Sequence, residues 1–332
     1  MTRQTKSHSN QRSYQIVIII ILLAAAVVST SFLLINLLKP YGKSNVWLSE
    51  KGDFVVGLIR TPAEDDGRTK QYDALINAID QSDCEKMVMN AERTQASQIE
   101  NMRALIAYRV DVIVFTPLVE TGWSRVLREA ADAQVEVIAV ANAIKYKSED
   151  PHCHTLTFDY FGGMQTCLED INGAFQDEQI MLELVGSVNA YSSRELSRGI
   201  RQRENGEIKV PEYSYSADNL TSYAEEITLG VLAAHPQVNL IFAQNEGMLL
   251  GAYAAVQEMP QHSQVCKLYG LGSSQRIYDL YETGAIDCLL WADNEILSEV
   301  LTDLLIDLKQ HIETEPRIVE IPLQILADKE RE

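Results

Sequence analysis

The chain has 332 residues, carries a formal net charge of −19 and is 46% hydrophobic. This length suits one or two globular domains. Because binding to nucleic-acid phosphates needs a clustered basic face, the acidic balance argues against a nucleic-acid partner.

The first 52 residues differ from the rest of the chain. Residues 1–13 contain Arg3, Lys6 and Arg12 and no acidic residue, and residues 14–38 carry no charge. About 20 apolar residues span a bilayer, so we predict a cytoplasmic tail over 1–13, a transmembrane anchor over 14–38 and a linker over 39–52. A cleaved signal peptide is the alternative, although its apolar core is usually only about 7–15 residues long. The basic tail favours a cytoplasmic N-terminus, which places the remaining chain outside the cytoplasm.

From residue 53 onward, short apolar runs alternate with segments of helical spacing. The first three helices are expected over 68–81, 95–108 and 122–133. This alternation is typical of parallel sheets covered on both faces. Ten strands are too many for one comfortable sheet, so we predict an α/β fold of two doubly wound parallel-sheet lobes. The predicted strands cover 54–59, 86–91, 110–116, 135–141, 155–159, 180–186, 208–214, 240–245, 266–272 and 286–292.

The junction after the third predicted strand carries a Gly-Trp pair. Gly122 allows a close turn there, and Thr121 is expected to cap the following helix with its hydroxyl. Trp123 then lies in the first helical turn, where we expect it to pack on the strand end as a buried anchor. Ligands of such folds sit beyond the carboxyl ends of the strands, so direct contact of Trp123 with a ligand is the alternative.

Several segments, in this order, resemble the type I periplasmic sugar-binding proteins. They are VGLI (56–59), SQIENMRALIAYRVDVIVFTPLVETGW (97–123), VLREAADAQVEVIAV (126–140) and LIFAQNEGMLLGAYAAVQE (240–258). The Pro-x-x-x-Thr-Gly-Trp run is most similar to the galactofuranose-binding branch, and FAQNEGMLLGA also resembles ribose-binding proteins. The resemblance covers about residues 53–328 and implies two lobes joined by three crossings, with a ligand clamped between them. We expect 53–143 and 293–316 in the N-terminal lobe, and 144–292 and 317–332 in the C-terminal lobe.

The resemblance also implies positions for a ligand site. Arg68 stands where the galactofuranose branch has an arginine, although the aromatic residue that precedes this arginine is Gly67 here. Asn245 matches the family's ligand-binding asparagine, and Asp159 matches an acid that follows the first strand of the second lobe. The loop after the first strand adds a candidate charged rim; a solvated loop is its alternative. The rim consists of Arg60, Glu64, Asp65 and Arg68.

Other positions depart from the family pattern. Ala141-Asn142 replace an Asp-Arg pair, which leaves Asn142 as the candidate there, and Gly272 replaces an aspartate. Leu196 replaces an arginine, for which the neighbouring Arg194 or Arg198 could substitute. Since charge-assisted bonds contribute about 1.5–3 kcal/mol each, a common pyranose held in the usual way is not expected. Trp291 lies near a polar family position, where it could stack on a sugar ring or serve the core.

The remaining motifs give no cofactor, metal or catalytic site. GLGSS at 270–274 lacks the third glycine of a dinucleotide loop. HCH at 152–154 is expected on a strand, where successive side chains point to opposite faces, so the three side chains cannot converge and we predict no metal site. No Gly-x-Ser-x-Gly elbow or metalloprotease helix occurs, and we predict that the protein is not an enzyme.

The predicted function is that of an extracytoplasmic, membrane-anchored solute-binding protein, with a sugar or sugar derivative as the expected ligand. Its partner would be the permease of an ABC importer or a membrane histidine kinase. A protein-interaction module that has lost small-ligand binding is the alternative.

The five cysteines form no Cys-x-x-Cys pair. In the family, the strands that carry Cys266 and Cys288 are parallel neighbours, which makes this pair a candidate disulfide outside the cytoplasm. Cys153 and Cys167 bracket a short strand and the start of a helix, and they form a second candidate pair. Five reduced, buried cysteines are the alternative.

Overall fold

A computed structural model describes residues 54–62, 66–147, 149–151, 153–174, 179–202, 211–262, 265–311 and 315–327. The expected anchor over 14–38, its tail and linker, and the candidate residues Glu64 and Asp65 lie outside the described residues. Within the described ranges, no helix combines the length and the apolar character needed to cross a membrane.

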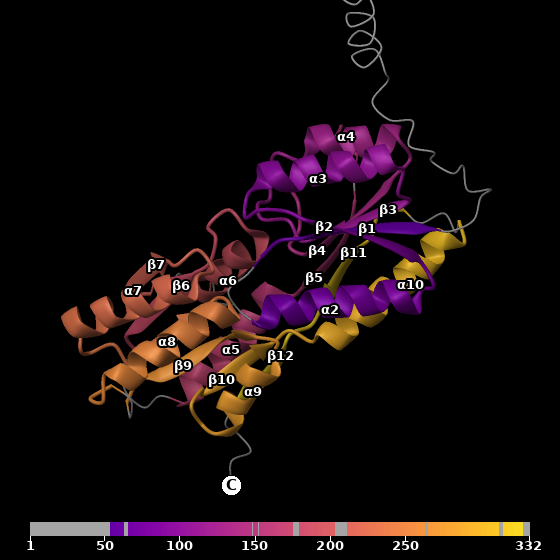
Figure 1. The fold of residues 1–332 in the computed structure, drawn as a ribbon. Helices are drawn as coiled ribbons and strands as arrows, with labels where there is room; N and C mark the ends of the chain where they lie inside the picture. The colour runs from indigo at the N-terminus through magenta and orange to yellow at the C-terminus, as the bar shows by residue number, and fades with distance from the viewer. Residues whose placement is uncertain are drawn as a thin grey trace, which may run out of the picture. The chain divides into compact units, whose positions relative to one another are not determined.

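The first lobe is built on a six-stranded sheet in the order β11-β5-β4-β3-β1-β2, with parallel pairing throughout. Helices α2 (Asp66–Gln81) and α10 (Asn294–Lys309) cover one face, and α3 (Gln95–Tyr108) and α4 (Ser124–Asp132) cover the other (Figure 1). The strands are β1 (Val55–Arg60), β2 (Glu85–Asn90), β3 (Val112–Phe115), β4 (Glu136–Ala141), β5 (His154–Phe158) and β11 (Ile318–Ile321).

The second lobe repeats this plan with the strand order β12-β10-β9-β8-β6-β7, in which only β12 runs antiparallel to its neighbour. Helices α5 (Tyr160–Ala174) and α6 (Tyr191–Arg201) cover one face, and α7 (Thr221–Ala234), α8 (Glu246–Glu258) and α9 (Gln275–Glu282) cover the other. The strands are β6 (Met181–Val185), β7 (Tyr213–Ser216), β8 (Leu240–Ala243), β9 (Lys267–Gly272), β10 (Cys288–Trp291) and β12 (Gln324–Ala327). The prediction of two α/β lobes is therefore confirmed.

The chain passes between the lobes three times, and these crossings correct the predicted boundaries. Residues 154–158 and 318–321 form strands of the first sheet, because β5 pairs with β4 and β11 pairs with β5. The crossings lie at 159, 292–293 and 322–323. Asp159 thus follows the last core strand of the first lobe, where its carboxylate accepts a 2.8 Å hydrogen bond from the Gly162 amide.

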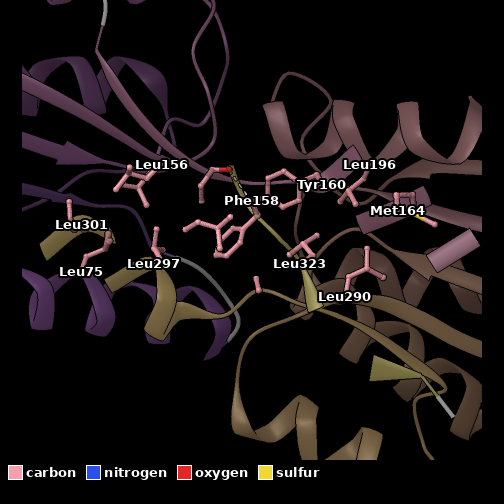
Figure 2. Close-up of a cluster of buried hydrophobic side chains, with 14 of the residues drawn as sticks. Leu75, Leu156, Phe158, Tyr160, Met164, Leu196, Leu290, Leu297, Leu301 and Leu323 are labelled. Carbon is pink, nitrogen blue, oxygen red and sulfur yellow. Dashed lines mark hydrogen bonds between the residues drawn. The ribbon is translucent and has the colours of Figure 1, made fainter. Parts of the chain in front are cut away.

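One apolar core runs through both lobes at the crossings. Leu75 and Leu297 contribute to it from the first lobe, and Leu196 and Leu290 contribute from the second (Figure 2). Side chains adjoining the crossings, such as Phe158, fill the space between them. The joint between the lobes is therefore packed, which fixes where the strand ends of the two sheets face each other.

The Gly-Trp junction folds largely as expected. Gly122 adopts a positive φ of 91°, and Trp123 is only 1% exposed. The Trp123 ring lies edge-on to Phe115 at 5.0 Å, and its Nε1 donates a 2.8 Å hydrogen bond to the Val119 carbonyl. The predicted buried anchor is confirmed. The predicted cap is wrong, because α4 begins at Ser124 with Trp123 at the N-cap and no side-chain cap bond.

The structure forms neither predicted disulfide, and all five cysteines are free thiols. Cys288 pairs in register with Tyr269, three positions beyond Cys266, and the two thiols lie in cores on opposite faces of the second sheet. Cys153 and Cys167 likewise belong to different cores. Cys167 instead lies beside Cys288, and burial followed by this contact raises the pKa of the Cys167 thiol.

Candidate ligand-binding site

A cavity of about 90 Å³ lies between the lobes at the carboxyl ends of their strands. One water molecule needs only about 10–15 Å³ by this measure. A second cavity of about 40 Å³ adjoins it and shares Arg68, Leu118, Asn219 and Asn245 with its lining. The larger cavity is lined by Gly67, Arg68, Gln71, Leu118, Ala141, Asn142, Phe158, Tyr160, Ala190, Ser192, Asn219, Gln244, Asn245, Glu246, Leu271, Gly272, Ser273, Ala292 and Asn294.

The first turn of α2 brings Arg68 to both cavities. Its Nη1 donates a 2.6 Å hydrogen bond to Oε1 of Gln71, one turn further along the helix. The same Gln71 oxygen also lies 3.4 Å from the Thr116 hydroxyl at the end of β3. These bonds hold the guanidinium in a defined position at the cavity wall, where it can donate to a ligand.

Gly67 allows the two lobes to approach each other beside the cavity. A Cβ atom at this position would lie 2.8 Å from Oε2 of Glu246 and 2.9 Å from the Ser273 hydroxyl. Both of these residues belong to the second lobe. The structure thus gives a physical reason for a glycine here, since any side chain would meet the loop after β9 or the start of α8.

The start of α8 supplies two polar residues to the cavity. Asn245 is the N-cap residue, and its Oδ1 accepts a 2.9 Å hydrogen bond from the Met248 amide. The buried Glu246 carboxylate accepts hydrogen bonds from the amides of Ser273 at 2.9 Å and Ser274 at 3.0 Å, and from the Ser274 hydroxyl. The charge of Glu246 is therefore already bound by protein donors.

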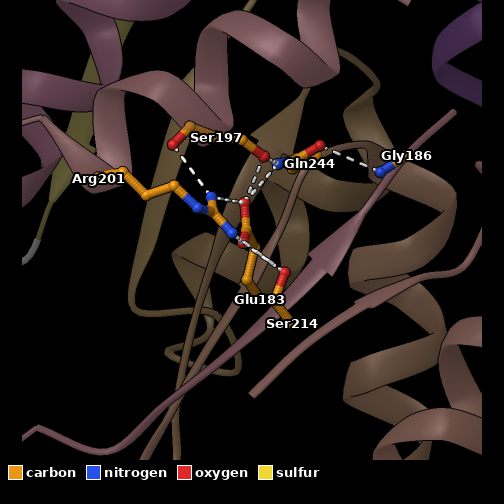
Figure 3. A network of polar contacts seen from close by, with 6 residues as sticks. All are labelled: Glu183, Gly186, Ser197, Arg201, Ser214 and Gln244. Carbon is orange, nitrogen blue, oxygen red and sulfur yellow. Dashed lines mark hydrogen bonds and ion pairs between the residues drawn. The ribbon is translucent and has the colours of Figure 1, made fainter. Parts of the chain in front are cut away.

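Gln244 is held by a network of polar contacts around the buried Glu183 carboxylate (Figure 3). Its Nε2 donates a 2.8 Å hydrogen bond to Glu183, which is 0% exposed, and its Oε1 accepts one of 3.1 Å from the Gly186 amide. Arg201 pairs with the Glu183 carboxylate at 2.7 Å. We call this set the Glu183 cluster; it comprises Glu183, Gly186, Ser197, Arg201, Ser214 and Gln244.

The lobes also bond to each other directly along one rim of the cavity. The Glu120 amide of the first lobe donates a 3.0 Å hydrogen bond to the Asn189 carbonyl of the second. Arg194 of α6 donates through Nε to the Glu120 carboxylate at 2.9 Å, and Lys145 pairs with the same carboxylate at 2.8 Å. Lys145 belongs to the first lobe, but the bonds of Glu120 to Asn189 and Arg194 exist only when the lobes are together, so the structure shows a closed arrangement.

Asn142 uses both ends of its side chain for bonds within the protein, and one of these bonds joins the lobes. Its Nδ2 donates to the Pro117 carbonyl in the first lobe, and its Oδ1 accepts from the Ser192 amide in the second, each at 3.0 Å. The preceding Ala141 has a positive φ of 63°, and its carbonyl accepts a 3.0 Å hydrogen bond from the Tyr160 hydroxyl. Such strained backbone persists where its surroundings hold it, and it often occurs at binding sites.

The cavity brings together three of the residues predicted from the sequence, namely Arg68, Asn142 and Asn245. Three others line neither of the two cavities described above: Arg60, Arg194 and Trp291. The Arg60 guanidinium lies 5.4 Å from the Tyr72 ring centroid, and Trp291 packs edge-on against Tyr278 at 5.7 Å.

Leu196 is buried in the core that runs through both lobes. The neighbouring Arg198 pairs with Glu195 at 2.5 Å and does not replace the missing arginine at the cavity.

Sequence reasoning missed several lining residues. Gln244 and Ser273 directly follow β8 and β9, so their position beyond a strand end was an available signal. Asn294 opens α10, after the second crossing. No local pattern distinguishes Gln71, Asn219 or Asn294 from ordinary surface amides.

The prediction that HCH at 152–154 forms no metal site is not fully tested, because His152 lies outside the described residues. In the described ranges, no three His, Cys, Asp or Glu side chains gather in a way that could hold a metal ion. His154 is buried, and its Nδ1 accepts a 3.3 Å hydrogen bond from the Arg317 amide.

Known proteins share this fold and part of the sequence. The galactofuranose-binding protein YtfQ of Escherichia coli K12 is 27% identical over 180 residues, which is 52% of this chain and 55% of that protein. The fructose import binding protein FruE of Bifidobacterium longum is 26% identical over 215 residues, which is 63% of this chain and 65% of that protein. The matched region thus spans about half to two thirds of these curated relatives.

A crystal structure from Mycobacterium smegmatis in complex with β-D-fucofuranose has the same fold, with a TM-score of 0.73 and 23% identity over 82% of this chain and 91% of that chain. The family described as "Periplasmic binding protein domain" matches residues 56–313, well over half of the sequence. The chain belongs to this periplasmic binding protein family.

Proposed function

We propose that the protein binds a neutral monosaccharide or a close sugar derivative between its two lobes. The cavity lining carries the proposal, because amides and hydroxyls from both lobes converge on the cavity of about 90 Å³. Of the lining residues that the structure describes, only Arg68 and Glu246 are charged, and Glu246 is engaged by Ser273 and Ser274. Sugar hydroxyls both donate and accept hydrogen bonds, which matches a wall of amides.

The closing contacts supply a mechanism for capture. In the open protein, the Glu120 carboxylate and Arg194 would be apart, whereas in the closed protein they bond across the cavity rim. A ligand that bonds to both lobes adds its free energy to the closed state alone and so shifts the population toward closure. The rim contacts then exclude water from the ligand.

The names of the relatives support a sugar ligand. One relative is a galactofuranose-binding protein, another a fructose import binding protein, and a third is the ribose import binding protein of Salmonella typhimurium. Family membership also supports a location outside the cytoplasm. We extend this with the predicted anchor, in which residues 14–38 hold the binding lobes at the outer side of the membrane.

Two roles follow for an anchored binding protein. It delivers the sugar to an ABC permease, as the import names of the relatives suggest, or it presents the bound state to a membrane histidine kinase. The uncharged segment over 14–38 favours the second role. Neighbouring genes discriminate the two, since an importer requires a permease and an ATPase, whereas sensing requires a kinase and a response regulator.

The anchor itself is tested by N-terminal analysis of the membrane-bound protein. We expect residues 14–38 to be retained. A mature chain that begins near residue 32 or beyond would contradict the anchor and leave sugar binding unaffected.

Sugar binding is tested by thermal unfolding with a panel of D-ribose, D-fructose, D-galactose, L-arabinose, D-allose and myo-inositol. A ligand at about 100 times its Kd stabilises a protein by about 2.7 kcal/mol, which corresponds to a rise in Tm of about 5–10 °C. We expect at least one panel member to produce such a rise. A flat response to the whole panel would favour the protein-interaction module that has lost small-ligand binding.

Arg68 and Asn245 provide the site-directed part of this test, because they reach the cavity from opposite lobes. Arg68→Met and Asn245→Ala should each lower the affinity for the sugar that binds best at least fivefold, as measured by calorimetry. Arg125→Met is the matched control, since the Arg125 side chain is 85% exposed on α4. Unchanged affinity in both cavity variants would place the sugar elsewhere.

A further inference from the structure

Asn294 differs from the other asparagines and glutamines of the cavity. It lines the larger cavity from the start of α10, and its Oδ1 and Nδ2 atoms are both buried. Neither atom has a hydrogen-bond partner among the described residues. Buried polar atoms are nearly always paired, so an amide with two unpaired ends requires an explanation.

The helix does not need Asn294. Asp293 is the N-cap residue of α10, and its Oδ1 accepts hydrogen bonds from the amides of Glu295 at 2.9 Å and Ile296 at 3.3 Å. Asparagine is also a poorer helix former than alanine or glutamate. Local structure therefore gives no reason for an amide side chain at this position.

The position of Asn294 is nevertheless well fixed. Helix α10 packs on α2 through Leu297, Leu301 and Leu75 (Figure 2), and the Ser298 hydroxyl donates a 3.0 Å hydrogen bond to the Ala74 carbonyl. Asn294 lies one turn before Ser298, directly after the crossing at 292–293. A rigid helix thus presents the amide to the cavity, which lowers the entropic cost of binding through it.

We propose that Asn294 is a ligand contact that reads two neighbouring hydroxyl groups of the bound sugar, an inference that rests on the proposed function. Oδ1 accepts the proton of one hydroxyl, and Nδ2 donates to the oxygen of the next. Asn142 and Gln244 line the same cavity, but their amides bond to Pro117, Ser192 and the Glu183 cluster. Asn294 therefore contributes to the choice of which sugars keep their hydroxyls satisfied after closure.

The test compares wild type with Asn294→Leu, which keeps the approximate volume and removes both polar atoms, and with Asn294→Asp, which replaces the donor with a second, charged acceptor oxygen. Asn101→Leu is the matched control, because Asn101 also has a buried, unpaired Nδ2 but lies on α3 and does not line the cavity. The probe is the sugar of the panel above that wild type binds best, measured by calorimetry together with its monodeoxy analogues.

We expect at least tenfold weaker binding by Asn294→Leu, an intermediate loss in Asn294→Asp and no change in Asn101→Leu. The Tm of sugar-free Asn294→Leu should match wild type or exceed it, because no internal bond is lost. For one or two deoxy analogues, the ratio of the wild-type and Asn294→Leu affinities should fall toward one, since those analogues lack the hydroxyls that Asn294 reads.

The outcomes separate the two proposals. A panel that does not bind to wild type overturns the proposed function and, with it, this inference. If a sugar binds to wild type and its affinity for Asn294→Leu is within twofold of that value, the inference about Asn294 is overturned while the proposed function stands. A loss in Asn294→Leu that stays the same for every deoxy analogue also overturns it, because the effect would then be indirect.

Discussion

The Glu183 cluster and the wall formed by Asn294 are both polar regions beside one cavity, but their hydrogen bonds end in different places. Glu183 is fully buried and meets Arg201, Ser197, Ser214 and Gln244. Asn294 is bonded to nothing among the described residues through its side chain. A buried group whose hydrogen bonds are satisfied within the protein stabilises the fold. An unsatisfied group at a cavity can instead form its hydrogen bonds with a ligand. Lining a cavity therefore does not by itself identify a ligand contact.

We expect the largest effect from a substitution that disrupts the Glu183 cluster. Arg201→Met leaves the Glu183 carboxylate buried without its ionic partner, which typically costs 3–5 kcal/mol; the remaining bonds reduce this to about 3 kcal/mol of unfolding free energy. Denaturant unfolding measures the loss. Arg125→Met should change stability by less than about 0.5 kcal/mol. If Arg201→Met behaved like this control, the cluster would not carry the stability assigned to it.

The next effect concerns the contact that brings the lobes together. Gly67→Ala places a methyl group 2.8 Å from the Glu246 carboxylate, so the closed state should lose about 1–2 kcal/mol and sugar affinity should fall about tenfold. Gly230→Ala is the control, because a Cβ there meets nothing within 4 Å. It should stabilise α7 by up to about 1 kcal/mol without changing affinity. Equal affinities for the two alanine variants would show that Gly67 does not limit closure.

A smaller effect is expected at the rim. Glu120→Gln removes the charge that pairs with Arg194 and Lys145, whose side chains are 41% and 52% exposed. Because solvent screens such pairs, we expect a loss of about 1 kcal/mol from the closed state and about fivefold weaker sugar binding in calorimetry. Glu129→Gln removes a carboxylate that pairs only within the first lobe, with Arg103 and Arg125, and should leave affinity unchanged. A larger effect of Glu129→Gln than of Glu120→Gln would refute the role of the rim in closure.

We expect the smallest effect from His154, whose unpaired nitrogen does not line the cavity. His154 Nε2 is buried without a hydrogen-bond partner, and burial followed by the charge of Arg317 lowers the pKa of His154 below its usual 6.5. The unfolded chain therefore binds a proton before the folded protein does, so stability should fall as pH drops below about 6.5 and level off below the folded-state pKa. The Glu136 carboxylate at 3.8 Å does not reverse this direction.

Unfolding measured between pH 5 and 8 should show this slope in wild type and a reduced slope in His154→Gln, with sugar affinity unaffected in both. An unchanged slope in the variant would assign the pH dependence to other groups.

The fold was largely predictable, because apolar runs and helical spacing are local signals. The helix over Gln95–Tyr108 and the buried Trp123 illustrate this. The boundary between the lobes was not predictable, since strand order depends on which sheet edge a strand joins, and nothing local directs β5 to β4. The strands β11 and β12 were not among the predicted strands. The disulfides were wrong because sequence spacing does not tell which face of a sheet a cysteine occupies.

The candidate site was predictable only where position decides the role. The family resemblance indicated Arg68, Asn142 and Asn245, and all three line the cavity. Arg194 also lies close to a family position, but its guanidinium bonds to Glu120. The resemblance therefore indicated the region and not the direction in which the side chain points. Asn294 could not be predicted, because what marks it is the lack of a partner in three dimensions.

The most direct test of the account is a crystal structure of the wild-type protein with the sugar of the panel that binds best. We predict that the sugar lies in the cavity between the lobes, with two neighbouring hydroxyl oxygens within about 3.2 Å of Oδ1 and Nδ2 of Asn294. The Asn142 side chain should still bond to Pro117 and Ser192. A sugar bound in that cavity with Asn294 still unpaired, or a sugar bound outside it, would contradict the account.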